Sequence, residues 1–131
     1  MKKNFIVGQS NEVIKGKNLY DLHNLYNFVE VCVNTENSQL KILFQPLDGF
    51  QKQKNSIVFI FHSLDYLELS TDFGTRKITT LEELGYKAPN DYDTDWILSE
   101  NQSSPDDHLF FRLNKDNYVR VHSEKVNLLE G

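Results

Sequence analysis

The stretch HLFFRLNKDNYVRVHSEKVNLLE, residues 108–130, predicts the hairpin that closes an antiparallel sheet. Apolar residues recur at every second position in two runs of this stretch, which is typical of strands with one buried face. Five side chains define that face: Leu109, Phe111, Leu113, Val119 and Val121. A further short strand is expected over residues 125–129.

The register of this hairpin follows from its apolar face. All five side chains point to one side if Leu113 lies opposite Val119 and Phe111 lies opposite Val121, whereas a slip of one residue would turn one run toward water. This register leaves residues 115–117 as the loop, and the last of them, an asparagine, is expected in the left-handed conformation.

Three upstream runs show the same period. FVEVCVN (28–34) and QLKILFQ (39–45) are predicted to form a second hairpin around the turn formers TENS. SIVFIFHSLDYLELS (56–70) is too long for one flat strand, and its apolar face changes near His62 and Ser63. We therefore expect a bulge or bend at that point.

Helical patterns are fewer. TTLEELGY (79–86) has Thr80 three residues before Glu83, a capping-box spacing, and a glycine as a stop, which predicts one short helix. KNLYDLHNLYNF (17–28) carries apolar residues at helical spacing and is a second candidate. The connection over 46–55 is predicted to be an irregular loop.

These elements predict a single domain of mainly β class, in which seven or eight antiparallel strands curl into a sandwich or a half-barrel with one or two short helices. An α+β arrangement is the alternative. The chain has 131 residues, enough to bury a core without disulfides, and its only cysteine, Cys32, fits a reducing compartment. It lacks both a membrane helix of about 20 apolar residues and a signal-peptide apolar region, so we expect a cytoplasmic protein.

The whole chain has a net charge of −5, and its negative charge is concentrated in one segment. A field of this sign repels nucleic acid and attracts basic surfaces. The alternative is a solvated loop that only keeps the protein soluble. Between residues 82 and 107 the only basic residue is Lys87. The acidic residues of this segment are Glu82, Glu83, Asp91, Asp93, Asp95, Glu100, Asp106 and Asp107.

The stretch NDYDTDW (90–96) spaces three aspartates as some calcium loops do. The sixth loop position is Trp96 where such a loop needs glycine, and the twelfth is Gln102 where it needs a bidentate glutamate. We therefore predict an acidic loop with neither metal nor cofactor. Trp96 and the two apolar residues after it are expected to anchor this loop on the body of the protein while its carboxylates face water.

Catalytic residues are not expected. His62, Ser63 and Asp65 are the residue types of a hydrolase triad, but they lie on one strand, where neighbouring side chains point to opposite faces. His108 and His122 share a face in the predicted register, without the further ligands that a zinc site requires.

One pair of residues suggests an anion. In the predicted register Arg112 lies directly opposite Arg120, and facing like charges destabilise a sheet. Two sources of negative charge stay open. The acidic segment over 91–107 could fold back over the pair, or an external phosphate or a partner's carboxylate could bind there.

SIVFIFHSLDYLELSTDFG (56–74) and the closing hairpin (108–130) resemble the paired β segments of small β-rich bacterial immunity-type proteins. Those proteins neutralise a cognate toxin in polymorphic-toxin and contact-dependent systems. The resemblance covers about half of the chain and rests on the order of the strands. It implies a non-enzymatic inhibitor of a basic toxin, because such proteins often use negative surfaces against basic nuclease toxins.

The function expected from the sequence is binding of a basic protein partner, with no role for nucleic acid or a membrane. The alternative is a small enzyme or a ligand-binding protein on the same scaffold. Carboxylates would steer the partner and aromatics would anchor it, and Tyr92 is preferred over Trp96 as the anchor. The partner-binding residues expected are Asp91, Tyr92, Asp93, Asp95, Trp96, Asp106 and Asp107.

Overall fold

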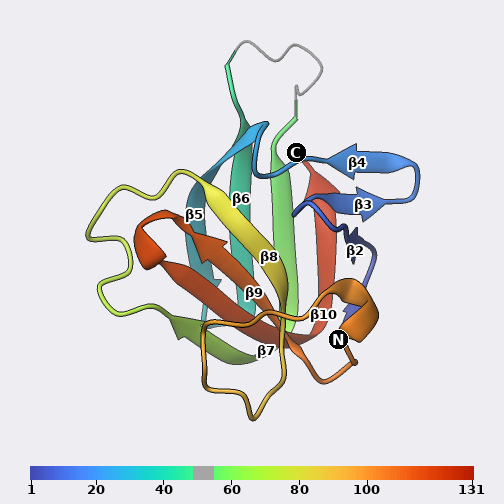
Figure 1. Cartoon of the computed structure of the whole chain (residues 1–131), viewed down its shortest axis with the longest axis vertical. Coiled ribbons are helices and arrows are strands. Elements are labelled where there is room, and N and C mark those ends of the chain that lie inside the picture. The colour runs from blue at the N-terminus through green and yellow to red at the C-terminus, as the bar shows by residue number, and fades with distance from the viewer. Residues whose placement is uncertain (49–54) are drawn as a thin grey trace.

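A computed structural model describes residues 1–48 and 55–131 as a mainly antiparallel β protein, built around one curled sheet (Figure 1). The mainly β prediction is confirmed in its half-barrel form, and most of the loop predicted over 46–55 lies outside the described residues. Seven strands form the curled sheet in this order, with β1 (Lys2–Lys3) parallel to β10: β5 (Tyr26–Asn34), β6 (Gln39–Pro46), β7 (Ile57–Leu69), β10 (Tyr118–Glu130), β9 (His108–Leu113) and β8 (Leu81–Lys87). The remaining elements are a small sheet and two 3-10 turns: β2 (Ile6–Val7), β3 (Val13–Lys15), β4 (Asn18–Tyr20), η1 (Glu100–Gln102) and η2 (Asn114–Asp116).

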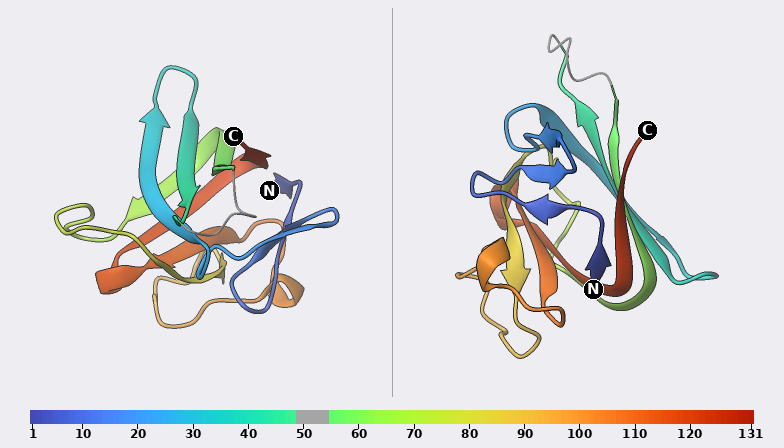
Figure 2. Two further views of the ribbon diagram at one scale, coloured as in Figure 1. Left: turned by 90° about the horizontal axis from the view of Figure 1, so that it is seen from above. Right: turned by 90° about the vertical axis from the view of Figure 1, so that its right-hand side faces the viewer.

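The curl of the sheet comes from its two longest strands, β7 and β10, which bend together (Figure 2). Their register shifts by one residue between His122 and Ser123, where β7 contributes the extra residue Asp65. Ser63 has a φ of 56°, which is uncommon for a serine. The bend predicted near His62 and Ser63 is therefore confirmed, and it wraps the sheet around the core.

The core is centred on three aromatic side chains from three strands of the sheet. Phe59 packs edge-on against Phe44 and Phe111, with ring centroids 6.0 and 5.4 Å apart, and Phe44 stacks on Phe111 at 6.4 Å. All three are fully buried. The small sheet adds its inner face, Val13 above all, while Phe5 packs edge-on against Phe59 at 5.3 Å.

The closing hairpin has the predicted apolar face, but the predicted register is wrong by two residues. Phe111 lies opposite Val119, and Leu109 lies opposite Val121. A displacement by an even number of residues keeps the same side chains inward. All five predicted core residues of the hairpin are consequently fully buried.

The turn of this hairpin explains the displacement. Lys115 and Asp116 take the left-handed conformation, with φ of 61° and 59°, whereas Asn117, which was predicted to take it, has a φ of −75°. Asn117 is buried and bonded instead. Its carbonyl oxygen accepts from the Leu113 amide at 2.7 Å, and its Oδ1 accepts from the Ser70 hydroxyl at 3.2 Å.

Both predicted helices are wrong. The segment over 79–86 contains most of strand β8, in which a bulge between Leu81 and Glu83 lets Leu81 and Leu84 point inward at a spacing that resembles a helix. The segment over 17–28 contains β4, a turn and the start of β5. Packing against neighbouring strands overrides the weak local preference in both places.

Candidate functional site

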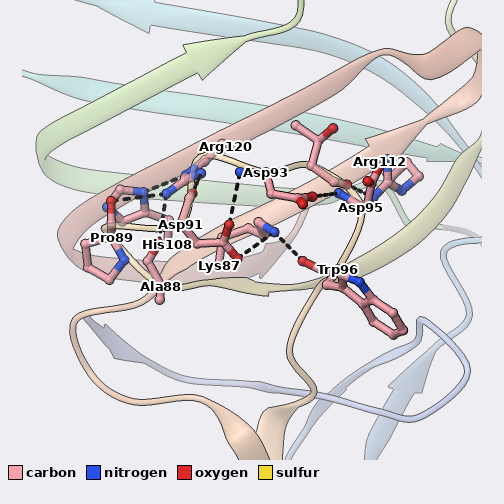
Figure 3. A network of polar contacts seen from close by, with 11 residues as sticks. Lys87, Ala88, Pro89, Asp91, Asp93, Asp95, Trp96, His108, Arg112 and Arg120 are labelled. Carbon is pink, nitrogen blue, oxygen red and sulfur yellow. Dashed lines mark hydrogen bonds and ion pairs between the residues drawn. The ribbon is translucent and has the colours of Figure 1, made fainter.

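Residues 88–98, which we call the acidic loop, follow β8 and fold back over the outer face of β8, β9 and β10 (Figure 3). This face is turned away from the aromatic core. Three cross-strand pairs of side chains point outward on this face: Lys87 with His108, Glu83 with Arg112, and Phe110 with Arg120. The acidic loop therefore lies on three cations: Lys87, Arg112 and Arg120.

Arg120 holds the first half of the acidic loop. Its guanidinium donates to the carbonyl oxygens of Asp91 at 2.6 Å, Ala88 at 3.0 Å and Pro89 at 3.4 Å. Its Nε donates to His108 Nδ1 at 2.9 Å. Only 2% of the arginine is exposed. The planar fork of donors thus holds three carbonyl oxygens of the main chain over residues 88–91 from beneath.

Lys87 and Arg112 hold the second half. The buried Lys87 Nζ forms an ion pair with Asp91 Oδ2 at 2.9 Å and donates to the carbonyl oxygen of Trp96. Arg112 pairs with Glu83 at 2.8 Å and donates to the carbonyl oxygen of Thr94. Most of these contacts reach the main chain of the loop, so the cations beneath it fix much of its path.

The prediction that Arg112 faces Arg120 is wrong. Arg112 lies opposite Tyr118 on β10, and Arg120 lies opposite Phe110 on β9. The acidic segment does fold back over both arginines, as one of the two alternatives predicted, but among the described residues its carboxylates form no ion pair with either of them. The carboxylate of Glu83 neutralises Arg112, and carbonyl dipoles of the acidic loop surround Arg120.

The aspartates of the loop bind its own backbone. Asp91 Oδ1 accepts from the Asp93 amide at 3.0 Å, and Asp93 Oδ1 accepts from the Asp95 amide. The hydrogen bond from Lys87 also holds the pKa of the Asp91 carboxyl below its usual value. In the two described parts of the chain, no three side chains of metal-ligating type gather into a site.

Two large aromatic side chains of the loop project into solvent. Tyr92 is 85% exposed and Trp96 is 79% exposed, and the Trp96 ring points away from the polar network (Figure 3). The expectation that Trp96 packs on the body is therefore wrong. The anchor is Leu98, which exchanges two backbone hydrogen bonds with Tyr86, at 2.9 and 2.7 Å. Gly85 allows this approach, because a Cβ there would lie 2.6 Å from the Leu98 carbonyl oxygen.

The remaining predicted partner-binding residues separate into exposed and engaged groups. Asp93, Asp95 and Asp106 are exposed. Asp91 is half-buried and paired with Lys87, while Asp107 is buried and accepts from the Ser104 amide at 2.8 Å. The segment is therefore less negative toward solvent than its composition indicates.

His108 and His122 lie on one face as predicted, with ring centroids 5.5 Å apart, but sequence reasoning missed the polar cluster that surrounds them beside the loop. Tyr66 stacks against His108 with ring centroids 4.3 Å apart, and His122 Nδ1 pairs with Asp65 Oδ1 at 2.7 Å. His122 Nε2 is buried and has no hydrogen-bond partner among the described residues. The hydroxyls of Tyr118 and Tyr66 donate to Glu68 and lower the pKa of its carboxyl. The polar residues alternating with the apolar ones on β7, β9 and β10 were the available signal.

His108 is held neutral by this arrangement. Burial first, and then the charge of Arg120, lower its pKa from 6.5 to about 4. The geometry requires the same state, because His108 Nδ1 accepts a hydrogen bond from Arg120 and must carry no proton.

The neutral state of His108 predicts a pH-dependent stability. Between pH 6.5 and about 4 the unfolded chain protonates this histidine and the folded chain does not. The free energy of unfolding should therefore fall by up to about 3 kcal/mol as the pH falls through this window. His108→Phe keeps the stack on Tyr66 and removes the titration. Urea unfolding at a series of pH values should give a shallower slope for this variant, and parallel profiles would contradict the assignment.

Comparison with protein-family models, curated proteins and solved structures gave no match to this chain. The fold defines a class, a curled antiparallel half-barrel with an ordered polar loop over its outer face. No helix in the described parts of the chain is long and apolar enough to cross a membrane.

Proposed function

We propose that this protein is a non-enzymatic binding protein whose acidic loop docks onto a basic protein partner. One observation carries the proposal. Tyr92 and Trp96 are the two most exposed large hydrophobic side chains of the described residues, and they stand on a loop whose main chain is held by three cations. Folding alone gives no reason to expose both rings on one ordered loop.

The order of the loop favours binding. A loop that must be immobilised on association loses conformational entropy, which subtracts from affinity. The hydrogen bonds from Lys87, Arg112 and Arg120 make that ordering part of folding instead. The rings of Tyr92 and Trp96 have few rotatable bonds, so they bury a large area at a small further cost in entropy.

The chemistry of the partner follows from the charges around the rings. Asp93 and Asp95 are exposed on the same loop. Asp106, which follows the loop in the sequence, is exposed as well. A complementary partner offers lysine or arginine side chains around an apolar centre that receives the rings. The aromatic side chains supply most of the interface energy, while the carboxylates at the rim accelerate association.

The resemblance to immunity-type proteins supports a finer form of the proposal, in which the basic partner is a toxin domain. The chain would then inhibit the toxin by covering a basic surface with the acidic loop. A basic nuclease fits this chemistry, because its own substrate is an anion.

The proposal predicts how binding responds to charge. A partner captured with the full chain as bait should bind Tyr92→Ala/Trp96→Ala at least about tenfold more weakly. Asp93→Asn/Asp95→Asn keeps the loop's internal acceptors and removes two charges. It should slow association roughly three- to tenfold at low salt and flatten the salt dependence of the rate.

The matched control is Asp116→Asn/Glu124→Gln, which removes two exposed carboxylates from elsewhere on the surface. It should leave the association rate and its salt dependence close to wild type. If the two double variants behave alike, or if the aromatic variant binds as tightly as wild type, the acidic loop is not the docking surface.

A further inference from the structure

The two terminal strands of the curled sheet differ in how their free edges are protected. On β8 the Leu84 amide donates to Asn11 Oδ1 at 3.0 Å, and Asn11 Nδ2 donates to the Glu82 carbonyl oxygen at 3.2 Å. The Tyr86 backbone bonds to Leu98 in both directions. The edge of β8 is therefore covered, and coverage of this kind prevents pairing with another chain.

The other terminal strand, β5, is open over its second half. The Phe28 amide donates to the Thr79 carbonyl oxygen at 2.8 Å and closes the beginning of this edge. From Glu30 to Asn34, no segment within residues 1–48 or 55–131 pairs with the outer edge. Val33 is 44% exposed, although its cross-strand partner on β6, Leu40, is fully buried. Core-facing side chains of β5 thus reach solvent at the end of the sheet.

We propose that the open edge of β5 pairs with the same edge of a second copy of this chain, antiparallel and centred on Cys32. In this register Val31 lies opposite the partner subunit's Val33, and Glu30 lies opposite the partner subunit's Asn34. Apolar side chains meet on the core face and no like charges face each other, as cross-strand pairing requires. The two curled sheets would join into one continuous sheet.

The features at the beginning of β5 favour this register. Moving the partner strand toward the beginning of β5 would bring it onto the bulge at Val29 and the position that Thr79 already occupies. Centring on Cys32 confines the pairing to residues 30–34. The symmetry is self-complementary, because each copy presents the same open stretch to the other.

Charge complementarity supports a second copy as the occupant. Beyond the paired residues, Glu36 lies in the turn that joins β5 to β6, and this turn of the partner subunit would come close to the Phe28 end of the edge. A groove of about 490 Å³ opens there, and two exposed cations, Arg76 and Lys77, line it together with Phe73 and Ile78. The contact is short, so we expect a dissociation constant on the order of 1 to 100 µM.

Sedimentation of the full chain over about 1 to 500 µM tests the proposal against this affinity range. The wild type should pass from monomer to dimer, and Val33→Lys should stay monomeric with an unchanged melting temperature. Leu129→Lys is the matched control, because Leu129 is 42% exposed on a different strand, and it should dimerise as wild type does. A wild type that is monomeric throughout, or a Val33→Lys variant that still dimerises, overturns the proposal.

Cross-linking tests the register. Cys32 is exposed, and on the two-fold axis its Cα would lie roughly 4.5 to 5.5 Å from its equivalent, within disulfide range. Mild oxidation should convert the dimer to a disulfide-linked form. Cys32→Ser/Asn34→Cys moves the thiols away from the axis and should cross-link at least about tenfold more slowly. Equal rates would overturn the register. Neither the sedimentation test nor the cross-linking test involves the acidic loop. Failure of the dimer proposal can therefore be distinguished from failure of the proposed function.

Discussion

Replacing Arg120 by methionine is expected to lower the free energy of unfolding by about 2–4 kcal/mol. Methionine fills much of the space of the arginine stem but donates no hydrogen bond. The carbonyl oxygens of Pro89 and Asp91 and the Nδ1 of the buried His108 would lose this donor, and the Ala88 carbonyl oxygen would keep only the Asp91 amide. Urea unfolding at pH 7 measures the loss.

Arg112→Met is the comparison for this variant. The Arg112 side chain is 20% exposed and pairs with the more exposed Glu83, so water can replace much of what is removed. Its loss should be about 1 kcal/mol or less. Equal losses from the two variants would mean that Arg120 does not hold the acidic loop in the way described.

Phe111→Ala is expected to lower the free energy of unfolding by about 3–5 kcal/mol, the range for truncating a buried phenylalanine. Phe111 touches the rings of both Phe44 and Phe59, so the cavity would open in the middle of the sheet, where three strands prevent collapse. Phe73→Ala is the control. Phe73 is only half-buried and meets one ring, that of Phe28, so its loss should stay below about 2 kcal/mol. A similar loss from both would place the core elsewhere.

Strands β5, β6, β7, β9 and β10 could be predicted from sequence because their two-residue period survives in the fold, whereas β1 to β4 and β8 were not predicted. The bend of β7 was also visible, since the apolar face changes at His62 and Ser63, next to the register shift at Asp65. The hairpin register was not predictable from faces alone, because registers that differ by two residues bury the same side chains. The left-handed conformation of Lys115 and Asp116 decides between them, and a lysine gives no signal for it, although an aspartate adopts it more often than most residues do.

The helix predicted over 79–86 failed for a related reason. A bulge in β8 shifts the inward positions by one, so Leu81 and Leu84 acquire the spacing of a helical face. Local pattern cannot distinguish the two cases. The partner strand β9 decides it, because it offers Leu113 and Phe111 opposite these two leucines.

The candidate site was only partly visible in the sequence. The sequence predicted the exposed aspartates and suggested that the acidic segment lies over Arg112 and Arg120. It did not predict that main-chain carbonyl oxygens would accept most of the hydrogen bonds, because those contacts join residues far apart in the chain. The exposure of Trp96 was missed because a tryptophan is expected to be buried.

Trp96 gives the most direct test of the central claim, that the acidic loop is the docking surface. It is the only tryptophan of the chain, so its fluorescence reports on the loop without labelling. The free protein should emit as a water-exposed indole that acrylamide quenches readily. Saturation with the captured basic partner, its own emission subtracted, should shift the emission to shorter wavelength and protect the indole from quenching. Emission and quenching that stay unchanged at saturation would contradict the account.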